Sequence, residues 1–350
     1  MQYPFQRLMR NATRLTGYGR LRAATAAIQT VLRSVAASQA AAPSRTRDGV
    51  IDVEARQRGQ RCDEAPASNP PAGEFVSGRW GTASQGRNYK LYVPPQAGQG
   101  RLPLVVMLHG CKQDPDDFAA GTRMNTLARE QGFFVLYPAQ SRQANPQGCW
   151  NWFKHSHQQR GRGEPAALAG MTQDIVNSRG VDPARVYVAG LSAGGAMAAI
   201  MAEAYPELYA AAGVHSGLAA GSANDLTSAL GAMRSGSAGT AATAASRPTI
   251  VFHGDADHTV HPTNAGHVVS ASVHGAAAAE SEQQRGADGR RGYTRNVHRA
   301  PDGRVLAEHW VVHGSPHAWS GGSTDGSYTD PSGPDASREM LRFFLEQRLA

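Results

Sequence analysis

A serine between small residues is the clearest chemical signal in the sequence. Residues 190–194 are Gly-Leu-Ser-Ala-Gly, and this G-x-S-x-G spacing permits a tight turn from a strand into a helix, with the serine strained and exposed at its apex. The apolar segment 186–189 is predicted to be that strand, and a helix of small residues is predicted to begin near Gly194. This context favours a nucleophilic Ser192 over a plain glycine-rich turn.

A serine hydroxyl is a weak nucleophile at neutral pH, so it needs a base and an orienting carboxylate, in the chain order serine, aspartate, histidine. The predicted strand 249–252 leads into a loop with two aspartates. Asp257 is preferred because the loop has room to turn its carboxylate toward a histidine, whereas Asp255 is better placed to cap the turn. Hydrogen-bonded loop residues are favoured over a metal site built from His253, Asp255, Asp257, His258 and His261.

Position selects the base among the eight histidines that follow Asp257. His317 comes after Gly-Ser-Pro, in a loop beyond the last predicted strand, residues 306–312. We therefore predict that His317 is the general base. His313, at the end of that strand, is the second choice, and His309 is expected to be a core or edge residue within the strand.

The tetrahedral intermediate of acyl transfer needs backbone N–H donors, usually the residue after the nucleophile and one from an early strand-to-helix loop. These residues are predicted to be Ala193 and Cys111, which follows the apolar strand 104–108. Gly110 lets the backbone approach the reacting carbonyl. The alternative for Cys111 is a small buried apolar residue.

The elements that must position these residues alternate between strands and helices. Residues 104–108 form an apolar run without alternation, which is typical of a parallel strand covered on both faces. We therefore expect an α/β protein with an open, mostly parallel sheet that binds ligands at the carboxyl ends of its strands. Residues 218–246 are either a lid or, as favoured, a flexible insertion. The predicted strands are 75–80, 87–93, 104–108, 133–137, 186–189, 211–215, 249–252 and 306–312.

The N-terminal part of the chain carries the net charge. The protein of 350 residues has a formal charge of +7, and residues 1–47 contain eight arginines and no lysine or acid, so the remainder sums to −1. Residues 1–73 are predicted to be a basic extension, with two short helices in 4–37 and a linker in 38–73, ahead of a catalytic domain at 74–350. A basic amphipathic surface binder is weighed against a helix packed on the domain or a targeting remnant, and the second is favoured.

These patterns bear on membrane insertion and export: no transmembrane span is expected, and a secretory signal is a poor match, although export is not excluded. The longest apolar run, 193–202, is far shorter than the roughly 20 residues of a transmembrane helix. Arginines interrupt each apolar stretch that a secretory signal would need. Any attraction to an anionic surface is assigned to the extension, and we expect no transmembrane span, no nucleic-acid partner and no cofactor.

Four segments stand out: His109-Gly110-Cys111, residues 149–153 (Cys-Trp-Asn-Trp-Phe), residues 190–197 (Gly-Leu-Ser-Ala-Gly-Gly-Ala-Met) and residues 317–322 (His-Ala-Trp-Ser-Gly-Gly). Together they resemble the polyhydroxybutyrate depolymerase family of esterases, over roughly residues 75–349. The resemblance implies an α/β-hydrolase fold flanked by helices, with Ser192, Asp257 and His317 as its catalytic triad. It also implies a disulfide between Cys111 and Cys149, with Cys62 unpaired.

Such a disulfide favours an oxidising compartment, so an extracellular or periplasmic location is expected. The arginine-rich start and the lack of a recognisable polymer-binding module keep a cytoplasmic enzyme associated with polymer granules as the alternative. In either case the basic extension is the candidate contact with a granule or another anionic surface.

Aromatic residues in these motifs are candidates for substrate contact. Trp150, Trp152 and Trp319 are placed at the mouth of the site, where flat rings suit a polyester chain or an aromatic acid. Trp319 is favoured because its loop must reach the nucleophile, and burial as ordinary core is the competing interpretation for all three.

The sequence therefore predicts a serine carboxylester hydrolase of the polyhydroxybutyrate depolymerase type. The same family includes feruloyl and acetylxylan esterases, so the resemblance leaves the ester open. A serine peptidase on the same fold and a granule-binding protein with a vestigial triad are the alternatives from other classes.

Overall fold

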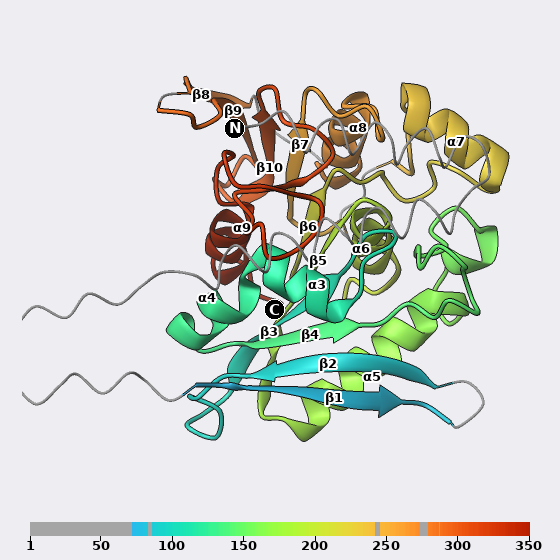
Figure 1. The fold of residues 1–350 in the computed structure, drawn as a ribbon, viewed down its shortest axis with the longest axis vertical. Helices are drawn as coiled ribbons and strands as arrows, with labels where there is room; N and C mark the ends of the chain where they lie inside the picture. Colours follow the sequence, from blue (N-terminus) through green and yellow to red (C-terminus); the bar gives the residue numbers. More distant parts are fainter. Residues whose placement is uncertain (1–71, 83–85, 242–245, 274–278, 287) are drawn as a thin grey trace, which may run out of the picture. The chain divides into compact units, whose positions relative to one another are not determined.

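The computed structural model describes residues 72–82, 86–241, 246–273, 279–286 and 288–350 (Figure 1). The predicted helices of the N-terminal extension, nearly all of its linker and Cys62 lie outside these ranges. Within them, no helix is long and apolar enough to cross a membrane.

One large sheet forms the framework of the described chain. Its ten strands have the order β1-β2-β4-β3-β5-β6-β7-β10-β9-β8. The strands from β4 to β10 in this order pair in parallel, and antiparallel strands border them on both sides. The bounds are β1 (Glu74–Trp80), β2 (Arg87–Val93), β3 (Leu102–Leu108), β4 (Phe134–Pro138), β5 (Val181–Leu191), β6 (Ala211–His215), β7 (Thr249–Gly254), β8 (Glu280–Gln284), β9 (Tyr293–Arg299) and β10 (Val305–Val312).

Helices cover both faces of this sheet (Figure 1). Alternate residues of β3 show why: Leu104 packs in a cluster with residues of α5 and α6, whereas Val105 packs in a second cluster with residues of α3, α4 and α9. A strand buried on both sides needs the uninterrupted apolar run seen in the sequence. The helices are α3 (Pro115–Thr122), α4 (Met124–Gln131), α5 (Gly163–Ser178), α6 (Ala193–Ala204), α7 (Leu226–Ser235), α8 (Thr263–Ser272) and α9 (Ala336–Leu345), with a short 3₁₀ turn η1 (His155–His157).

All eight predicted strands are present, and three elements differ from the prediction. The strands β8 and β9 carry no apolar run; every residue of β8 is exposed. The segment expected to be a flexible insertion contains α7, which begins with a capping box in which Asp225 accepts from the Ser228 N–H at 2.7 Å. A cap of this kind stabilises a helix that lacks a strong apolar pattern.

Candidate active site

Ser192 lies in the turn between β5 and α6, with φ 57° and ψ −118°. A positive φ is strained for a residue other than glycine and persists only where the surroundings fix it. The Ser192 N–H donates to the His215 carbonyl at 2.8 Å. A Cβ atom at Gly194 would overlap the Leu108 carbonyl, and one at Gly190 would overlap the Gly194 backbone. The small residues around the serine are therefore required by close packing of this turn on β3.

Asp257 and His317 lie in the loops after β7 and β10 and form a hydrogen bond of 2.6 Å between Oδ2 and Nδ1. The other carboxylate oxygen of Asp257 accepts from the backbone N–H groups of Thr259 and Val260 at 2.8 and 2.9 Å. An ionised carboxylate only accepts, so Nδ1 of His317 carries the proton and its Nε2 is left as an acceptor.

Asp257 is 3% exposed, yet it favours the charged form. Burial raises the pKa of its carboxyl, but hydrogen bonding with His253 and His317 and the Val260 N–H together hold that pKa well below its usual value. The His253 Nε2 lies 3.3 Å from this carboxylate and donates to the Val260 carbonyl at 2.9 Å.

The second-choice residues form a separate pair. His313 Nδ1 lies 2.9 Å from Asp255 Oδ2, and the other oxygen of Asp255 accepts from the Gly314 N–H at 2.6 Å. Asp255 was expected to cap its own turn, but its carboxylate instead bonds to the loop after β10, and Asp257 accepts from the N–H groups of the turn. Among the described residues, no three His, Cys, Asp or Glu side chains gather in a way that would hold a metal ion.

His215 connects the two halves of the site and was missed by the sequence analysis. Besides accepting from Ser192 through its carbonyl, it accepts from the Ser320 N–H through Nε2 at 2.9 Å, three residues beyond His317. Its ring stacks on Trp319 with centroids 5.1 Å apart. Burial, with smaller effects from nearby histidines, lowers the pKa of His215 well below its usual value, so the imidazole is neutral. Its only sequence signal was its place at the end of a predicted strand.

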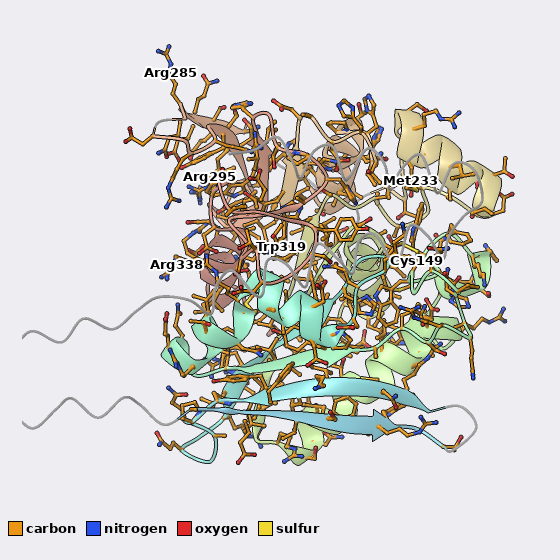
Figure 2. All side chains as sticks on the ribbon, viewed as in Figure 1. Cys149, Met233, Arg285, Arg295, Trp319 and Arg338 are labelled. Carbon is orange, nitrogen blue, oxygen red and sulfur yellow. A yellow bond between two sulfur atoms is a disulfide. The ribbon has the colours of Figure 1, made fainter. Side chains whose placement is uncertain are left out.

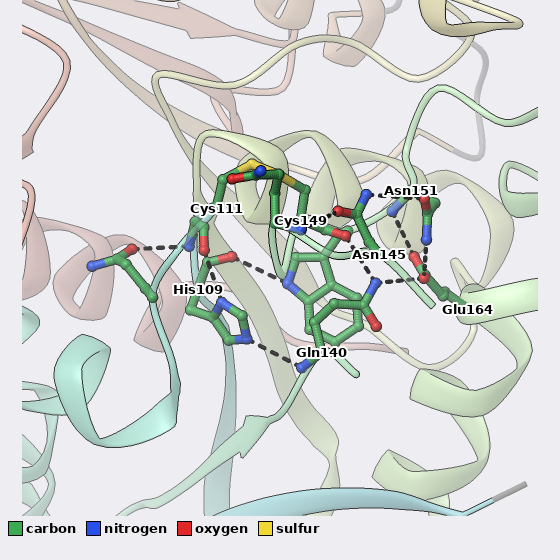
Figure 3. The surroundings of a disulfide bond; sticks show 11 residues. His109, Cys111, Gln140, Asn145, Cys149, Asn151 and Glu164 are labelled. Carbon is green, nitrogen blue, oxygen red and sulfur yellow. Dashed lines mark hydrogen bonds between the residues drawn. A yellow bond between two sulfur atoms is a disulfide. The ribbon is translucent and has the colours of Figure 1, made fainter. Parts of the chain in front are cut away.

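The loop after β3 carries the first predicted oxyanion donor. In the described part of the chain, neither the Cys111 nor the Ala193 N–H has a hydrogen-bond acceptor. The predicted disulfide between Cys111 and Cys149 is present, with Cα atoms 4.2 Å apart (Figure 3). The Trp150 indole N–H donates to the His109 carbonyl at 3.1 Å, which also holds the two loops together.

Glu164 is a buried carboxylate behind this disulfide that the sequence analysis did not single out (Figure 3). It accepts from the backbone and side-chain amides of Asn151, both at 2.7 Å, and from Gln140 Nε2 at 2.5 Å. Burial raises the pKa of Glu164, but His157 and these donors lower it below its usual value. The charge thus fixes the loop that contains Cys149.

The three tryptophans are buried in the described structure: Trp150 and Trp319 are 1% exposed and Trp152 is 5% exposed. Trp319, labelled in Figure 2, donates to the Ser337 hydroxyl at 3.0 Å and packs edge-on against Phe118. This packing agrees with the competing interpretation as core, and a contact with substrate stays a prediction.

Neighbouring parallel strands bring these residues to one edge of the sheet. The strands β3, β5, β6, β7 and β10 are adjacent in that order, and carboxyl ends of parallel strands share an edge. The residues at or just after those ends are Cys111, Ser192, His215, Asp257 and His317.

Comparisons with known proteins show the family to which the chain belongs. A family model described as esterase PHB depolymerase matches residues 87–295. Poly(3-hydroxyalkanoate) depolymerase C of Paucimonas lemoignei is 31% identical over 238 residues, covering 64% of this chain and 56% of that protein. Acetylxylan esterase A of Aspergillus awamori is 31% identical over 199 residues, covering 50% and 62%. The chain spans about half the length of the curated relatives it matches.

Among solved structures, the acetyl xylan esterase from Aspergillus awamori superposes with a TM-score of 0.62 at 21% identity, covering 77% of this chain and 99% of that one. The fold is therefore that of the α/β-hydrolases, as predicted.

Proposed function

Because this chain belongs to the esterase PHB depolymerase family, we propose that it is a serine carboxylester hydrolase that forms an acyl-enzyme on Ser192 and cleaves polyesters of the polyhydroxyalkanoate type. The observation that carries the proposal is the short hydrogen bond from His317 to the buried Asp257 carboxylate, at the same sheet edge as a serine held at positive φ. A nucleophile, a base and its orienting acid are the parts that acyl transfer requires.

In the proposed reaction, the Ser192 Oγ attacks the ester carbonyl while His317 Nε2 takes the hydroxyl proton. The resulting imidazolium is stabilised by Asp257 and returns the proton to the departing alcohol. A water molecule then attacks the acyl-enzyme with the same base, releasing the acid and restoring Ser192. Every proton is returned, so the cycle needs no cofactor.

The unpaired N–H groups of Cys111 and Ala193 are assigned to the negative oxygen of each tetrahedral intermediate. One such donor typically contributes about 3 kcal/mol to transition-state stabilisation. Their preorganisation matters because the charge appears only during the reaction, when the protein has no time to rearrange.

The substrate class rests on the relatives. The depolymerase C of Paucimonas lemoignei aligns with a larger share of this chain than the acetylxylan esterase does, which supports a polyester. An acetylxylan or feruloyl esterase activity is the second candidate, because the acetyl xylan esterase structure is covered over 99% of its length.

Ser192→Ala tests the chemistry. Loss of the nucleophile is expected to lower kcat on a short p-nitrophenyl ester by about four orders of magnitude or more, with the folded state retained. Ser270→Ala, on the exposed face of α8, is the control and should hydrolyse the ester at the wild-type rate. Full activity in the Ser192 variant would remove the basis of the proposal.

A panel of amorphous polyhydroxybutyrate, methyl ferulate and acetylated xylan tests the substrate class. Release of hydroxybutyrate units, measured by chromatography of the soluble products, is the expected result. Release from only the feruloyl or acetylated substrate would replace the polyester with the second candidate.

A further inference from the structure

Gln113 lies between the two loops that the proposed reaction uses. We propose that it is a positioning residue whose carboxamide holds the Cys111 N–H in place and couples that loop to the chain segment beyond His317. This inference rests on the proposed function, since it concerns the oxyanion donor of the same site.

The Gln113 side chain closes the turn that contains Cys111. It is 7% exposed, and its Oε1 accepts from the Gly110 N–H at 2.9 Å. In return, the backbone N–H of Gln113 donates to the Gly110 carbonyl at 3.3 Å. Lys112, within this turn, has a φ of 66°, a strained value for a residue with a side chain. The reciprocal bonds therefore stabilise a backbone conformation that is unfavourable by itself.

The amide nitrogen of the Gln113 side chain donates to residues outside this turn. Nε2 donates to Asp117 Oδ2 at 2.8 Å and to the Ser327 carbonyl at 3.1 Å. Asp117, in turn, accepts from the Ser327 N–H at 2.8 Å and from its hydroxyl at 2.7 Å. Gln113, Asp117 and Ser327 thus form a closed group, which we term the amide bridge.

The amide bridge continues to the segment that follows His317. Ser327 lies two residues before β12 (Thr329–Asp330), which pairs with β11 (Trp319–Ser320). The Ser320 N–H is the group that donates to His215. A displacement of Gln113 is therefore expected to shift both the loop that contains Cys111 and the loop that contains His317.

The chemistry of the bridge requires an amide at position 113. One atom must accept from Gly110, and another must donate to both a carboxylate and a carbonyl, which is the donor and acceptor set of glutamine. Gln113→Glu keeps the acceptor but places a second negative charge against Asp117. Gln113→Met keeps much of the volume and removes every hydrogen bond of the carboxamide, including a longer one to the Ser327 hydroxyl at 3.4 Å.

Both variants are expected to lower kcat about 10- to 100-fold on a soluble p-nitrophenyl ester, with KM within about threefold of the wild type. A poorly placed donor weakens the transition state more than the bound ester. Gln96→Met is the matched control and should keep the wild-type kcat. Gln96 is also partly buried, and its Nε2 donates to the carbonyl of Arg129, a residue distant in sequence, at 3.0 Å.

Titration of Ser192 with a fluorophosphonate probe separates positioning from folding. A residue that is merely structural would lower the fraction of labelled protein and leave kcat per labelled site unchanged, and this result would overturn the inference. A wild-type protein that the probe does not label at Ser192 would instead refute the proposed function.

A charge exchange supplies the second test. Gln113→Glu combined with Asp117→Asn moves the donor amide to α3, and kcat should recover at least fivefold over Gln113→Glu alone. If the position 113 variants do not fold, Asp117→Asn alone decides, because it replaces the acceptor of the Gln113 amide. A several-fold lower kcat per labelled site is then expected, and an unchanged value would overturn the inference.

Discussion

Asp257 keeps its negative charge in a nearly dry environment because donors surround both of its oxygens. His317 and two backbone N–H groups bond it directly, and His253 lies 3.3 Å away. Burial alone would favour the neutral acid, so the arrangement works only as long as these donors stay in place. The contacts that orient His317 therefore stabilise the folded state fully only while the Asp257 carboxylate is ionised.

The lowered pKa of Asp257 predicts a specific pH dependence of stability. Its folded-state pKa lies below the unfolded value of about 3.9, so the stabilisation is complete above that value and is lost as the pH falls toward the folded-state pKa. Asp257→Asn removes this contribution. The free energy of unfolding, measured with urea at pH 6 and at pH 3, should fall less between these two pH values in the variant than in the wild type. An equal fall in both proteins would contradict the lowered pKa of Asp257.

Position in the sequence distinguished Asp257 and His317 from the nearby Asp255 and His313. It did not reveal the residues that support the site from elsewhere in the chain. The structure joins Asp257 to His317 and Asp255 to His313, a division that follows from where each lies relative to a strand end. His215 and Gln113 act through partners 105 and 214 residues away. Such contacts depend on the finished fold and leave no local pattern.

At the scale of elements, the turn from β5 into α6 is the most constrained part of the site. The α6 helix starts so close to β3 that its second residue, Gly194, has no room for a side chain. This proximity is what places the Ser192 turn beside the loop of Cys111.

Gly194→Ala is expected to destabilise the protein by about 3 kcal/mol or more and to abolish esterase activity, because the new methyl group would overlap the Leu108 carbonyl. Gly266→Ala is the matched control: it lies in α8 with no heavy atom within 4 Å of the added Cβ, and the helix should gain about 0.5–1 kcal/mol. Thermal unfolding measures both changes. Similar stability of the two variants would show that the turn can relax.

The disulfide adds a second constraint, between the loop after β3 and the loop that Glu164 holds. Its cysteines are separated by 38 residues, for which restriction of the unfolded chain corresponds to about 4 kcal/mol. Cys111→Ser with Cys149→Ser should lower the free energy of unfolding by roughly that amount and reduce kcat. Cys62→Ser is the control, and an equal loss in that variant would contradict the pairing.

The strands buried on both faces were predictable from apolar runs such as that of β3. The strands β8 and β9 were not predictable, because apolar and polar residues alternate little in them. They extend the sheet as β9 pairs with β10 and β8 pairs with β9. The helix α7 was not predicted, because the small and polar residues around it gave no apolar pattern; its capping box of Asp225 and Ser228 was recognised only in the structure.

At the scale of the whole molecule, charge and catalysis are assigned to different parts of the chain. The eight arginines of residues 1–47 exceed the net charge of the entire protein. Each basic residue near an anionic surface contributes about 1 kcal/mol of attraction. The rest of the chain sums to −1, so we expect no comparable net attraction from it.

A chain lacking residues 1–70 is therefore expected to hydrolyse a soluble ester as fast as the full chain and to lose adsorption to anionic lipid vesicles at low salt. Sedimentation with the vesicles measures the binding, and neutral vesicles provide the control. Slower hydrolysis by the shortened chain would show that the extension contributes to catalysis. Unchanged adsorption would show that the extension is not the part that binds the vesicles.

The outermost strand β8 has a consequence for how copies of this protein behave in concentrated solution. Its residues, Glu-Ser-Glu-Gln-Gln, are all exposed, and two of them are acidic. An open strand edge invites a neighbour's backbone to extend the sheet, and charged side chains along that edge discourage it. Here Glu282 and Glu280 form ion pairs with Arg295 and Arg299 of β9, so charges of both signs line this strand pair. Among the described residues no strand pairs with the outer edge of β8, and its charged side chains oppose self-association by cross-β growth at this end of the sheet.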